Sequence, residues 1–227
     1  MRLATTDIEA NIEAVRERIA RACQRAGRSP DEITIVAVTK TVEPSAIATA
    51  LKMGIRHFGE NRVQEAEEKI RQLSGLKPRP TWHMVGHLQS NKVKIAVEIF
   101  DIIHSVDSVR LAEVISRRTQ KTPPILLQVN VSGETTKSGF SIAEVEPALE
   151  AISRLPKIEI KGLMTMAPME TDAEQVRPVF RKLRSLRDSL RLEHLSMGMT
   201  DDFEVAIEEG ATLVRIGRAI FGERKVG

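Results

Sequence analysis

Residues 33–39 read Ile-Thr-Ile-Val-Ala-Val-Thr, and Lys40 follows them directly. A continuous run of β-branched and apolar side chains is typical of a strand that is buried on both faces, as in a parallel sheet. An amphipathic helical pattern precedes this run, and Gly27 and Pro30 end that pattern. We therefore expect a helix that leads into a buried parallel strand.

The same alternation of helix and strand repeats along the rest of the sequence. Seven more apolar runs predict strands, at residues 56–59, 82–85, 102–104, 125–131, 158–166, 194–196 and 212–216. Helical patterns follow the strands, at residues 44–53, 61–73, 90–97, 108–118, 142–153, 173–190 and 202–208. No Pro-, Gly- or Ser-rich linker and no shift in composition interrupts this series.

Eight strands that alternate with helices predict an α/β fold, a single (β/α)8 TIM barrel with an extra N-terminal helix. We expect residues 1–227 to form this one domain. An open doubly wound sheet is the alternative. Against it, no G-x-G-x-x-G sequence follows a strand, which the dinucleotide-binding sheets of that type carry.

The composition argues against several classes of function. The 34 Lys and Arg residues nearly balance the 31 Asp and Glu residues, and aromatic residues make up only 3% of the chain. A nucleic-acid-binding face needs clustered basic side chains, and single-strand binding also needs aromatic platforms, so we expect no nucleic-acid partner. No run of about 18 apolar residues is present and the N-terminus does not read as a signal peptide, so we expect no membrane contact.

Cys23 is the single cysteine of the sequence. It cannot form a disulfide within the chain, and no Cys/His spacing typical of a metal site surrounds it. We therefore expect a reducing, cytoplasmic location and no bound metal.

Lys40 stands at the end of the first predicted strand, and the sites of (β/α)8 barrels lie at the carboxyl ends of their strands. Its side chain shares the parity of Val36 and Val38, which predicts apolar walls around it. Burial lowers the pKa of a lysine, as a lysine that forms a Schiff base requires. A solvated lysine at a strand end is the alternative interpretation.

Two loops with glycines follow the last two predicted strands. Residues 196–200 read Ser-Met-Gly-Met-Thr, and residues 215–218 read Arg-Ile-Gly-Arg. Barrels often build a phosphate site in these two loops, from hydroxyl groups, glycine amides and a helix N-terminus. We expect such a site here; the alternative is that both glycines only turn the chain and Asp201 caps a helix.

Seven short motifs occur in one order along almost the whole chain. They lie within residues 36–40, 59–65, 82–92, 130–139, 162–166, 196–202 and 214–222. On these motifs the sequence resembles the pyridoxal-phosphate homeostasis proteins, the YggS/PROSC family. The barrel of that family is similar to the N-terminal domain of alanine racemase.

The resemblance assigns roles to the residues of the expected site. It implies that Lys40 holds pyridoxal 5'-phosphate as an aldimine and that Arg215 faces the pyridine nitrogen. It also implies that Ser196 and the backbone at Gly217 and Arg218 take the phosphate.

Other positions of the resemblance are less definite. Thr200 stands where the family often has serine and keeps the hydroxyl, whereas Val42 stands where the family often has a second lysine, which puts the role of that lysine in doubt. Asn61 opens a predicted helix, so it either contacts the cofactor or caps the helix. His83 is either a proton-transfer group or a core histidine, and we assign no role to Lys137 in its polar loop.

The resemblance implies a protein of intracellular pyridoxal phosphate (vitamin B6) homeostasis, with no catalytic residues and no turnover of its own. Pyridoxal phosphate and, as recipients, apoenzymes that use it are the expected partners, and we expect a monomer. A pyridoxal-phosphate-dependent amino-acid racemase and a Schiff-base aldolase acting on a sugar phosphate are the alternatives.

Racemisation needs two positioned bases. In the racemase that the barrel resembles, the second base is a tyrosine that depends on a further, β-rich domain. This sequence contains no tyrosine, and we expect no such domain. His83 or His104 keeps the racemase alternative open.

Overall fold

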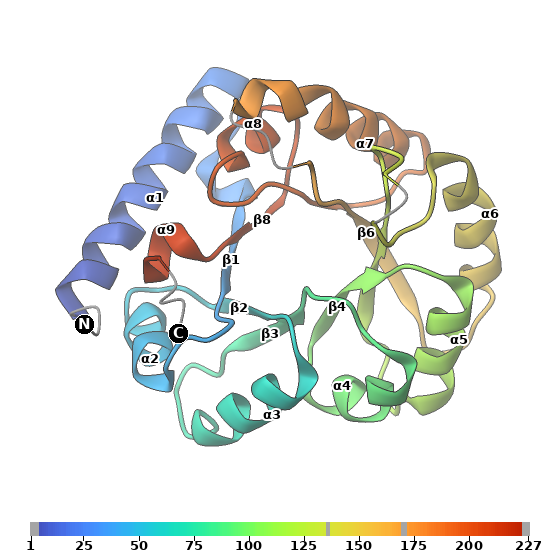
Figure 1. The fold of residues 1–227 in the computed structure, drawn as a ribbon, viewed down its shortest axis with the longest axis horizontal. Coiled ribbons are helices and arrows are strands. Elements are labelled where there is room, and N and C mark those ends of the chain that lie inside the picture. Colours follow the sequence, from blue (N-terminus) through green and yellow to red (C-terminus); the bar gives the residue numbers. More distant parts are fainter. Residues whose placement is uncertain (1–4, 135–136, 169–171, 224–227) are drawn as a thin grey trace.

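The computed structural model describes residues 5–134, 137–168 and 172–223, and within them eight parallel strands close into a barrel in chain order (Figure 1). The strands are β1 (Thr34–Val38), β2 (His57–Glu60), β3 (Thr81–Met84), β4 (Ile102–Val106), β5 (Pro124–Gln128), β6 (Glu159–Met164), β7 (His194–Ser196) and β8 (Leu213–Ile216). Closure comes from the pairing of β1 with β8. The predicted (β/α)8 barrel is confirmed.

Helices surround the barrel on its outside (Figure 1). The α-helices are α1 (Thr5–Ala26), α2 (Pro44–Lys52), α3 (Val63–Gln72), α4 (Val93–Ile99), α5 (Val109–Arg118), α6 (Ile142–Ser153), α7 (Arg177–Ser189), α8 (Phe203–Glu208) and α9 (Arg218–Phe221). Short 3-10 turns are η1 (Pro30–Glu32), η2 (Ser90–Lys92) and η3 (Ala173–Val176). The N-terminal helix α1 was predicted, whereas the four-residue α9 is too short to show a periodic pattern.

Several element ends differ from the predicted ones for local reasons. The predicted helix 173–190 is divided, because Pro178 in the first turn of α7 has no amide hydrogen and is suited to a helix start. The predicted strand 125–131 stops at Gln128 in the sheet. Beyond it, the amide of Asn130 donates to the carbonyl oxygen of Phe140 rather than to a neighbouring strand.

The strands separate two apolar regions. The larger lies between the sheet and the helices, and it includes Ala37 and Phe58. The smaller lies inside the barrel and consists of Val36, Val85, Leu126, Met164 and Leu213, with Val38 packed against it. Polar side chains share the interior with this small cluster, so the barrel is not filled by apolar layers alone.

Helix α1 connects the first and the last helices of the barrel. It packs against α2 on one side and against α8 and α9 on the other, as Figure 1 shows for the blue and red helices. The side-chain amide of Asn11 donates to the carbonyl oxygen of Ile220 at 3.1 Å, and Arg18 forms an ion pair with Glu204 at 2.8 Å. The buried face of α1 consists of Ile8, Ile12, Val15, Ile19, Ala22 and Cys23.

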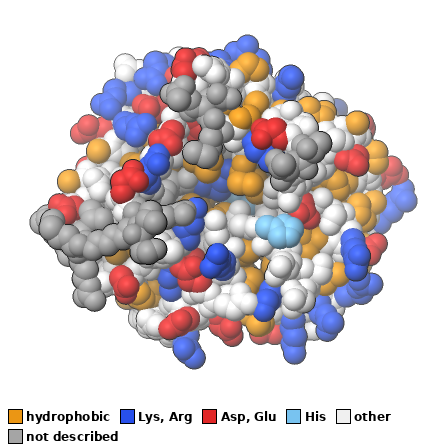
Figure 2. Space-filling view, in the orientation of Figure 1, with side chains coloured by type: hydrophobic (Ala, Val, Ile, Leu, Met, Phe, Trp, Pro, Cys, Tyr) orange, Lys and Arg blue, Asp and Glu red, His pale blue; other side chains and the backbone are white. Residues whose placement is uncertain are grey.

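Basic and acidic side chains intermingle across the face of the molecule that Figure 2 shows. This agrees with the near balance of charges in the sequence. None of the helices in the described part of the chain combines the length and the apolar character that a membrane crossing requires.

Gly162 provides a test of how closely the barrel strands pack. A Cβ atom at this position of β6 would lie 2.1 Å from the carbonyl oxygen of His194, its partner on β7. Because backbone cannot move aside like a flexible side chain, Gly162→Ala is expected to lower the free energy of unfolding by about 2 kcal/mol. Gly75→Ala is the matched control, since a Cβ there meets no atom within 4 Å. Urea unfolding of both variants measures the difference, and equal stabilities would contradict the packing.

Candidate functional site

The carboxyl ends of β1 and β8 lie side by side at one end of the barrel, which we call the mouth. Val36 of β1 pairs with Arg215 of β8. Two residues further along each strand, a Cβ atom on Gly217 would lie 3.4 Å from the carbonyl oxygen of Val38. Lys40 follows Val38 by two residues, so the barrel brings the predicted lysine next to the predicted glycine loop.

The loop after β7 reaches the first turn of α9. The hydroxyl of Thr200 accepts a hydrogen bond from the amide of Ala219 at 3.4 Å. Gly217 would tolerate a Cβ atom with ordinary contacts only, so its backbone stays open on that side. The Thr200 hydroxyl therefore lies beside the backbone of α9, and a phosphate site at this place stays a prediction.

Gly198 is required by the packing of its own loop. Its φ of +90° suits glycine, and a Cβ there would lie 2.6 Å from the Cβ of Ala206 on α8. The packing of this loop on α8 therefore requires a glycine, independently of any ligand.

Asp201 does not cap α8, so that alternative interpretation is wrong. The N-cap residue is Asp202, whose carboxylate accepts from the amide of Met199 at 2.5 Å. The carboxylate of Asp201 instead accepts from the guanidinium of Arg218 at 2.6 Å and 2.5 Å. The side chain of Arg218 is thus engaged with Asp201, and its backbone is the part suited to a ligand.

Arg215 is a buried cation with neutral hydrogen-bond partners. Its guanidinium donates to Oγ of Ser196 at 2.6 Å and to the carbonyl oxygen of Thr165 at 2.8 Å. In the described part of the chain, no carboxylate forms an ion pair with it. Burial lowers the pKa of Arg215 to about 10, so the group remains protonated at neutral pH. The barrel interior below the mouth therefore holds a positive charge, which the carboxylate of Asp202 stabilises electrostatically without a direct ion pair.

Ser196 lies inside the barrel wall. It is fully buried, and its hydroxyl contacts Arg215 and Nδ1 of His104, the latter at 2.9 Å. A direct contact of Ser196 with a phosphate, which the resemblance implies, stays a prediction. The observed contacts suit a residue that acts through Arg215.

A buried lysine ties together the groups beneath Lys40. The ammonium of Lys69 donates to the carbonyl oxygen of Thr39 at 2.5 Å, to Oε1 of Glu60 at 2.9 Å and to Oε1 of Glu65 at 2.6 Å. Burial raises the pKa of Glu60, which has no exposed surface. The helical pattern at residues 61–73 did not indicate this cluster.

Glu65 fixes the other side of Lys40. Its Oε1 atom accepts from the amide of Thr41 at 2.5 Å, and Thr41 has a φ of 62°. Burial opposes ionisation of Glu65, but the hydrogen bonds from Lys69 and the Thr41 amide lower its pKa overall. The residues before and after Lys40 are therefore both tied to one ionic cluster.

Replacing Lys69 with methionine is expected to lower the free energy of unfolding by about 3 kcal/mol, because the variant leaves the buried Glu60 carboxylate without its cation. Arg71→Met on the same helix changes an exposed basic residue and is expected to shift stability by less than about 0.5 kcal/mol. Urea unfolding of the two variants provides the comparison. Equal stabilities would show that the cluster contributes nothing.

Asn61 does not cap α3, so the capping interpretation of this residue is wrong. The N-cap residue is Arg62, and no side chain caps this helix end. A Cβ atom on Gly86 would lie 2.4 Å from the carbonyl oxygen of Asn61, so the loop after β3 packs directly on its backbone. Contact of Asn61 with a cofactor stays a prediction.

His83 is fully buried and forms hydrogen bonds with His57 at 2.9 Å and with His104 at 2.8 Å. The interpretation as a satisfied core histidine agrees with this geometry. Lys137 forms an ion pair with Glu134 at 2.7 Å in the loop after β5. Among the described residues, no group of His, Cys, Asp and Glu side chains could hold a metal ion.

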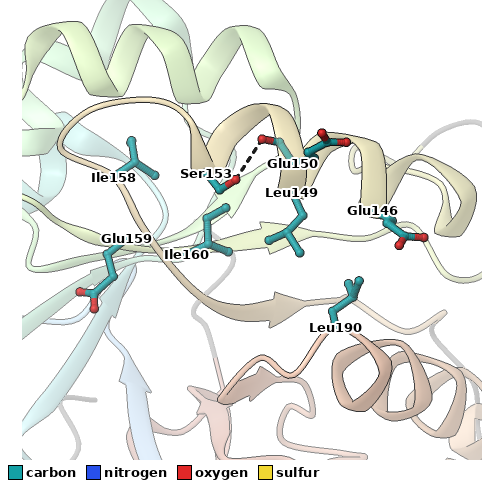
Figure 3. Close-up of a pocket in the computed structure, with 8 residues that line it drawn as sticks. All are labelled: Glu146, Leu149, Glu150, Ser153, Ile158, Glu159, Ile160 and Leu190. Carbon is teal, nitrogen blue, oxygen red and sulfur yellow. Dashed lines mark hydrogen bonds between the residues drawn. The ribbon is translucent and has the colours of Figure 1, made fainter.

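A surface hollow between α6, β6 and the end of α7 is separate from the mouth (Figure 3). Leu149, Ile160 and Leu190 contribute apolar side chains, and Glu146 and Glu159 stand at its edges. The residues predicted to bind a ligand lie elsewhere, at the carboxyl ends of β1, β2, β7 and β8.

Known proteins resemble this chain over nearly its whole length. Residues 10–225 match the family described as "Alanine racemase, N-terminal domain". A protein of Aquifex aeolicus named "Pyridoxal phosphate homeostasis protein" is 45% identical over 223 residues, covering 94% of this chain and 97% of that protein. A protein of the same name from Escherichia coli K12 is 42% identical over 231 residues, covering 96% and 97%.

Solved structures show the same likeness. PipY of Synechococcus elongatus, described as having PLP bound, is 37% identical, with a TM-score of 0.82 and coverage of 95% of this chain and 100% of that chain. An alanine racemase of Clostridium difficile 630 is 15% identical, with a TM-score of 0.71, and covers 97% of this chain but 57% of that chain. The second likeness concerns the fold alone.

Proposed function

This chain belongs to the alanine racemase N-terminal domain family and, within it, to the pyridoxal phosphate homeostasis proteins, and from that premise we propose that it binds pyridoxal 5'-phosphate and acts in vitamin B6 homeostasis. One observation carries the proposal. The end of β1, with Lys40, lies beside the buried cation of β8 and the glycine loop that follows it. A relative of the same fold, 37% identical, is described with PLP bound.

The groups at the mouth fit the chemistry of this cofactor. Pyridoxal phosphate supplies an aldehyde that a lysine amine captures reversibly as an imine, with release of one water. Lys40 has the amine, Arg215 has a charged donor, and Thr200 has a hydroxyl beside the amide of Ala219. We assign covalent attachment to Lys40.

The remaining predicted residues together orient the cofactor. Arg215 meets the pyridine ring, whereas Thr200 and the backbone of Gly217 and Arg218 hold the phosphate. Ser196 belongs to the site through its hydrogen bond to Arg215. We also assign Asn61 a contact with the cofactor, supported by its place directly after β2.

We propose that the protein has no turnover reaction of its own. The sequence contains no tyrosine, and an arginine that stays charged beside the ring nitrogen disfavours its protonation and so weakens the ring as an electron sink. Release of the cofactor to an incoming amine at Lys40 remains favourable, which suits a carrier. Apoenzymes that use pyridoxal phosphate are then the recipients. The protein acts as a one-domain monomer in the cytoplasm, and the buried, unpaired Cys23 suits that reducing location.

The absorbance spectrum of the purified protein tests the proposal. With pyridoxal phosphate added, we expect a band near ~420 nm that borohydride abolishes, since reduction converts the imine to an amine. A Schiff-base aldolase would instead be trapped by borohydride with a sugar phosphate and show no such band.

Exchange at the substrate carbon tests the absence of turnover. The loaded protein is incubated with L-alanine in deuterated water, and we expect neither loss of the α-proton nor formation of the D-enantiomer. Catalytic exchange of the α-proton together with formation of D-alanine would support the racemase alternative, with His83 or His104 as candidate second base.

A further inference from the structure

An unbroken series of hydrogen bonds crosses the barrel interior from β2 to β8. Nδ1 of His57 lies 2.9 Å from Nε2 of His83, and Nδ1 of His83 lies 2.8 Å from Nε2 of His104. Nδ1 of His104 lies 2.9 Å from Oγ of Ser196, which also accepts from Arg215 at 2.6 Å. We call these five residues the interior chain.

The chemistry of its members decides which group donates each hydrogen bond along the interior chain. A guanidinium only donates, so Oγ of Ser196 accepts from Arg215. In the described part of the protein, this hydroxyl contacts only Arg215 and His104. Its single hydrogen must therefore go to Nδ1 of His104, because the opposite arrangement would leave a fully buried hydroxyl hydrogen without an acceptor.

The direction continues through the imidazoles. A neutral His104 that accepts at Nδ1 carries its hydrogen on Nε2 and donates to Nδ1 of His83. His83 in turn carries its hydrogen on Nε2 and donates to Nδ1 of His57. The half-buried His57 then carries its own hydrogen on Nε2, at the end of the interior chain.

Burial keeps the interior imidazoles neutral. It lowers the pKa of His83 to about 3 and the pKa of His104 well below its usual value, and neighbouring charges including Arg215 lower that of His104 further. Every link therefore has one donor and one acceptor. The positive end of each link points away from Arg215, so the chain spreads the field of the buried cation across the barrel.

We propose that His104, backed by His83 and His57, is a positioning residue for Arg215. By taking the hydroxyl hydrogen of Ser196, it fixes the oxygen as an acceptor and holds the guanidinium in one orientation without a carboxylate. The carboxylate of Asp202 interacts with Arg215 electrostatically, but no ion pair between them is found among the described residues, so the neutral interior chain supplies the direct contact that orients the guanidinium. The proposal rests on the proposed function only in naming the cofactor ring as the group that Arg215 meets.

Nitrogen NMR of the full chain labelled with 15N-histidine tests the direction of the chain directly, without cofactor. Long-range proton–nitrogen correlations report which ring nitrogen carries the hydrogen, and we expect Nε2 in His57, His83 and His104 at pH 7. In Ser196→Ala, His104 loses its fixed donor, so we expect its tautomer to become mixed. His194, which instead lies near Thr212 at 3.4 Å, is the internal control and should not change. A hydrogen on Nδ1 of His104 in the unchanged protein would overturn the proposal.

Cofactor affinity tests the positioning role separately. His104→Leu removes the acceptor of the Ser196 hydrogen and is expected to raise the Kd for pyridoxal 5'-phosphate about tenfold, the size of one lost hydrogen bond. His104→Gln, whose amide oxygen can accept that hydrogen, should recover much of the affinity, and His194→Leu should match the unchanged protein. Equal affinity in His104→Leu would contradict the role of His104, whereas failure of the unchanged protein to bind would contradict the proposed function and leave the NMR result intact.

Discussion

Replacing Lys40 with alanine is expected to abolish covalent attachment of pyridoxal 5'-phosphate while the barrel stays folded. Lys40 lies beyond the end of β1 and is only partly buried, so loss of its side chain opens no core cavity. The groups that we assign to the ring and phosphate remain in the variant. We therefore expect weaker, non-covalent retention that gel filtration removes.

Borohydride reduction followed by intact mass and peptide mapping measures the attachment. The unchanged protein should gain the mass of one reduced cofactor on the peptide that contains residue 40, and Lys40→Ala should gain none. Lys52→Ala, on the outside of α2, is the control and should be labelled like the unchanged protein. A label on another lysine with Lys40 unmodified would contradict the assignment, and thermal unfolding checks that each variant is folded.

Lowering the pH from 7 to 5 is expected to remove about 4 kcal/mol from the free energy of unfolding. His83 and His104 are fully buried, and burial is the largest cause that lowers the pKa of each. In the unfolded chain both return to a pKa of about 6.5. Between that value and their folded values, these two groups let the unfolded state bind two protons that the folded state does not. Burial also lowers the pKa of His57 and of His194, which adds to the same trend.

Because the unfolded state binds more protons, the free energy of unfolding falls as the pH falls. The stabilising contribution is fully present above pH 6.5 and is lost as the pH falls towards the folded pKa values, with a slope of about 2.7 kcal/mol per pH unit. Urea unfolding at pH 7, 6 and 5 measures the slope. A slope equivalent to less than one proton would show that the interior imidazoles are not held neutral.

The barrel could be predicted from the sequence because its signal is local. Each buried strand is a short apolar run, and each helix carries its own periodicity, as residues 33–39 and the helix before them illustrate. Lys40, Gly217 and Arg215 could be assigned to one end of the barrel since parallel strands present their carboxyl ends together. Helix boundaries were harder to place, and capping, one of the two roles considered for Asn61, belongs to no side chain at that helix end.

The interior chain could not be predicted in the same way. Its members lie up to 92 positions apart along consecutive links, and their distances depend on barrel closure and on the register of several strands. The alternation of side chains along a strand gave a partial indication that His57 faces the barrel interior. His57 precedes Gly59 by two residues and lies opposite the inward-facing Val36, which places it inside the barrel once β1 and β2 pair.

The Lys69 cluster was missed for a different reason. A lysine four residues after Glu65 is typical of an exposed helical ion pair. Lys69 also continues the spacing of Val63 and Ala66, the buried face of α3, and this spacing is the signal that could have indicated its burial. The charge pattern and the burial pattern of one residue disagreed, and burial decided its role.

The position of α1 has a consequence for the synthesis of the protein. Its contacts with α8 and α9 join residues about 200 positions apart, such as Asn11 and Ile220. On a ribosome, these contacts cannot form until the last barrel unit has been translated and has left the exit tunnel. Throughout elongation the apolar face of α1 therefore lacks its partners on α8 and α9, and the nascent chain exposes part of this face to chaperones.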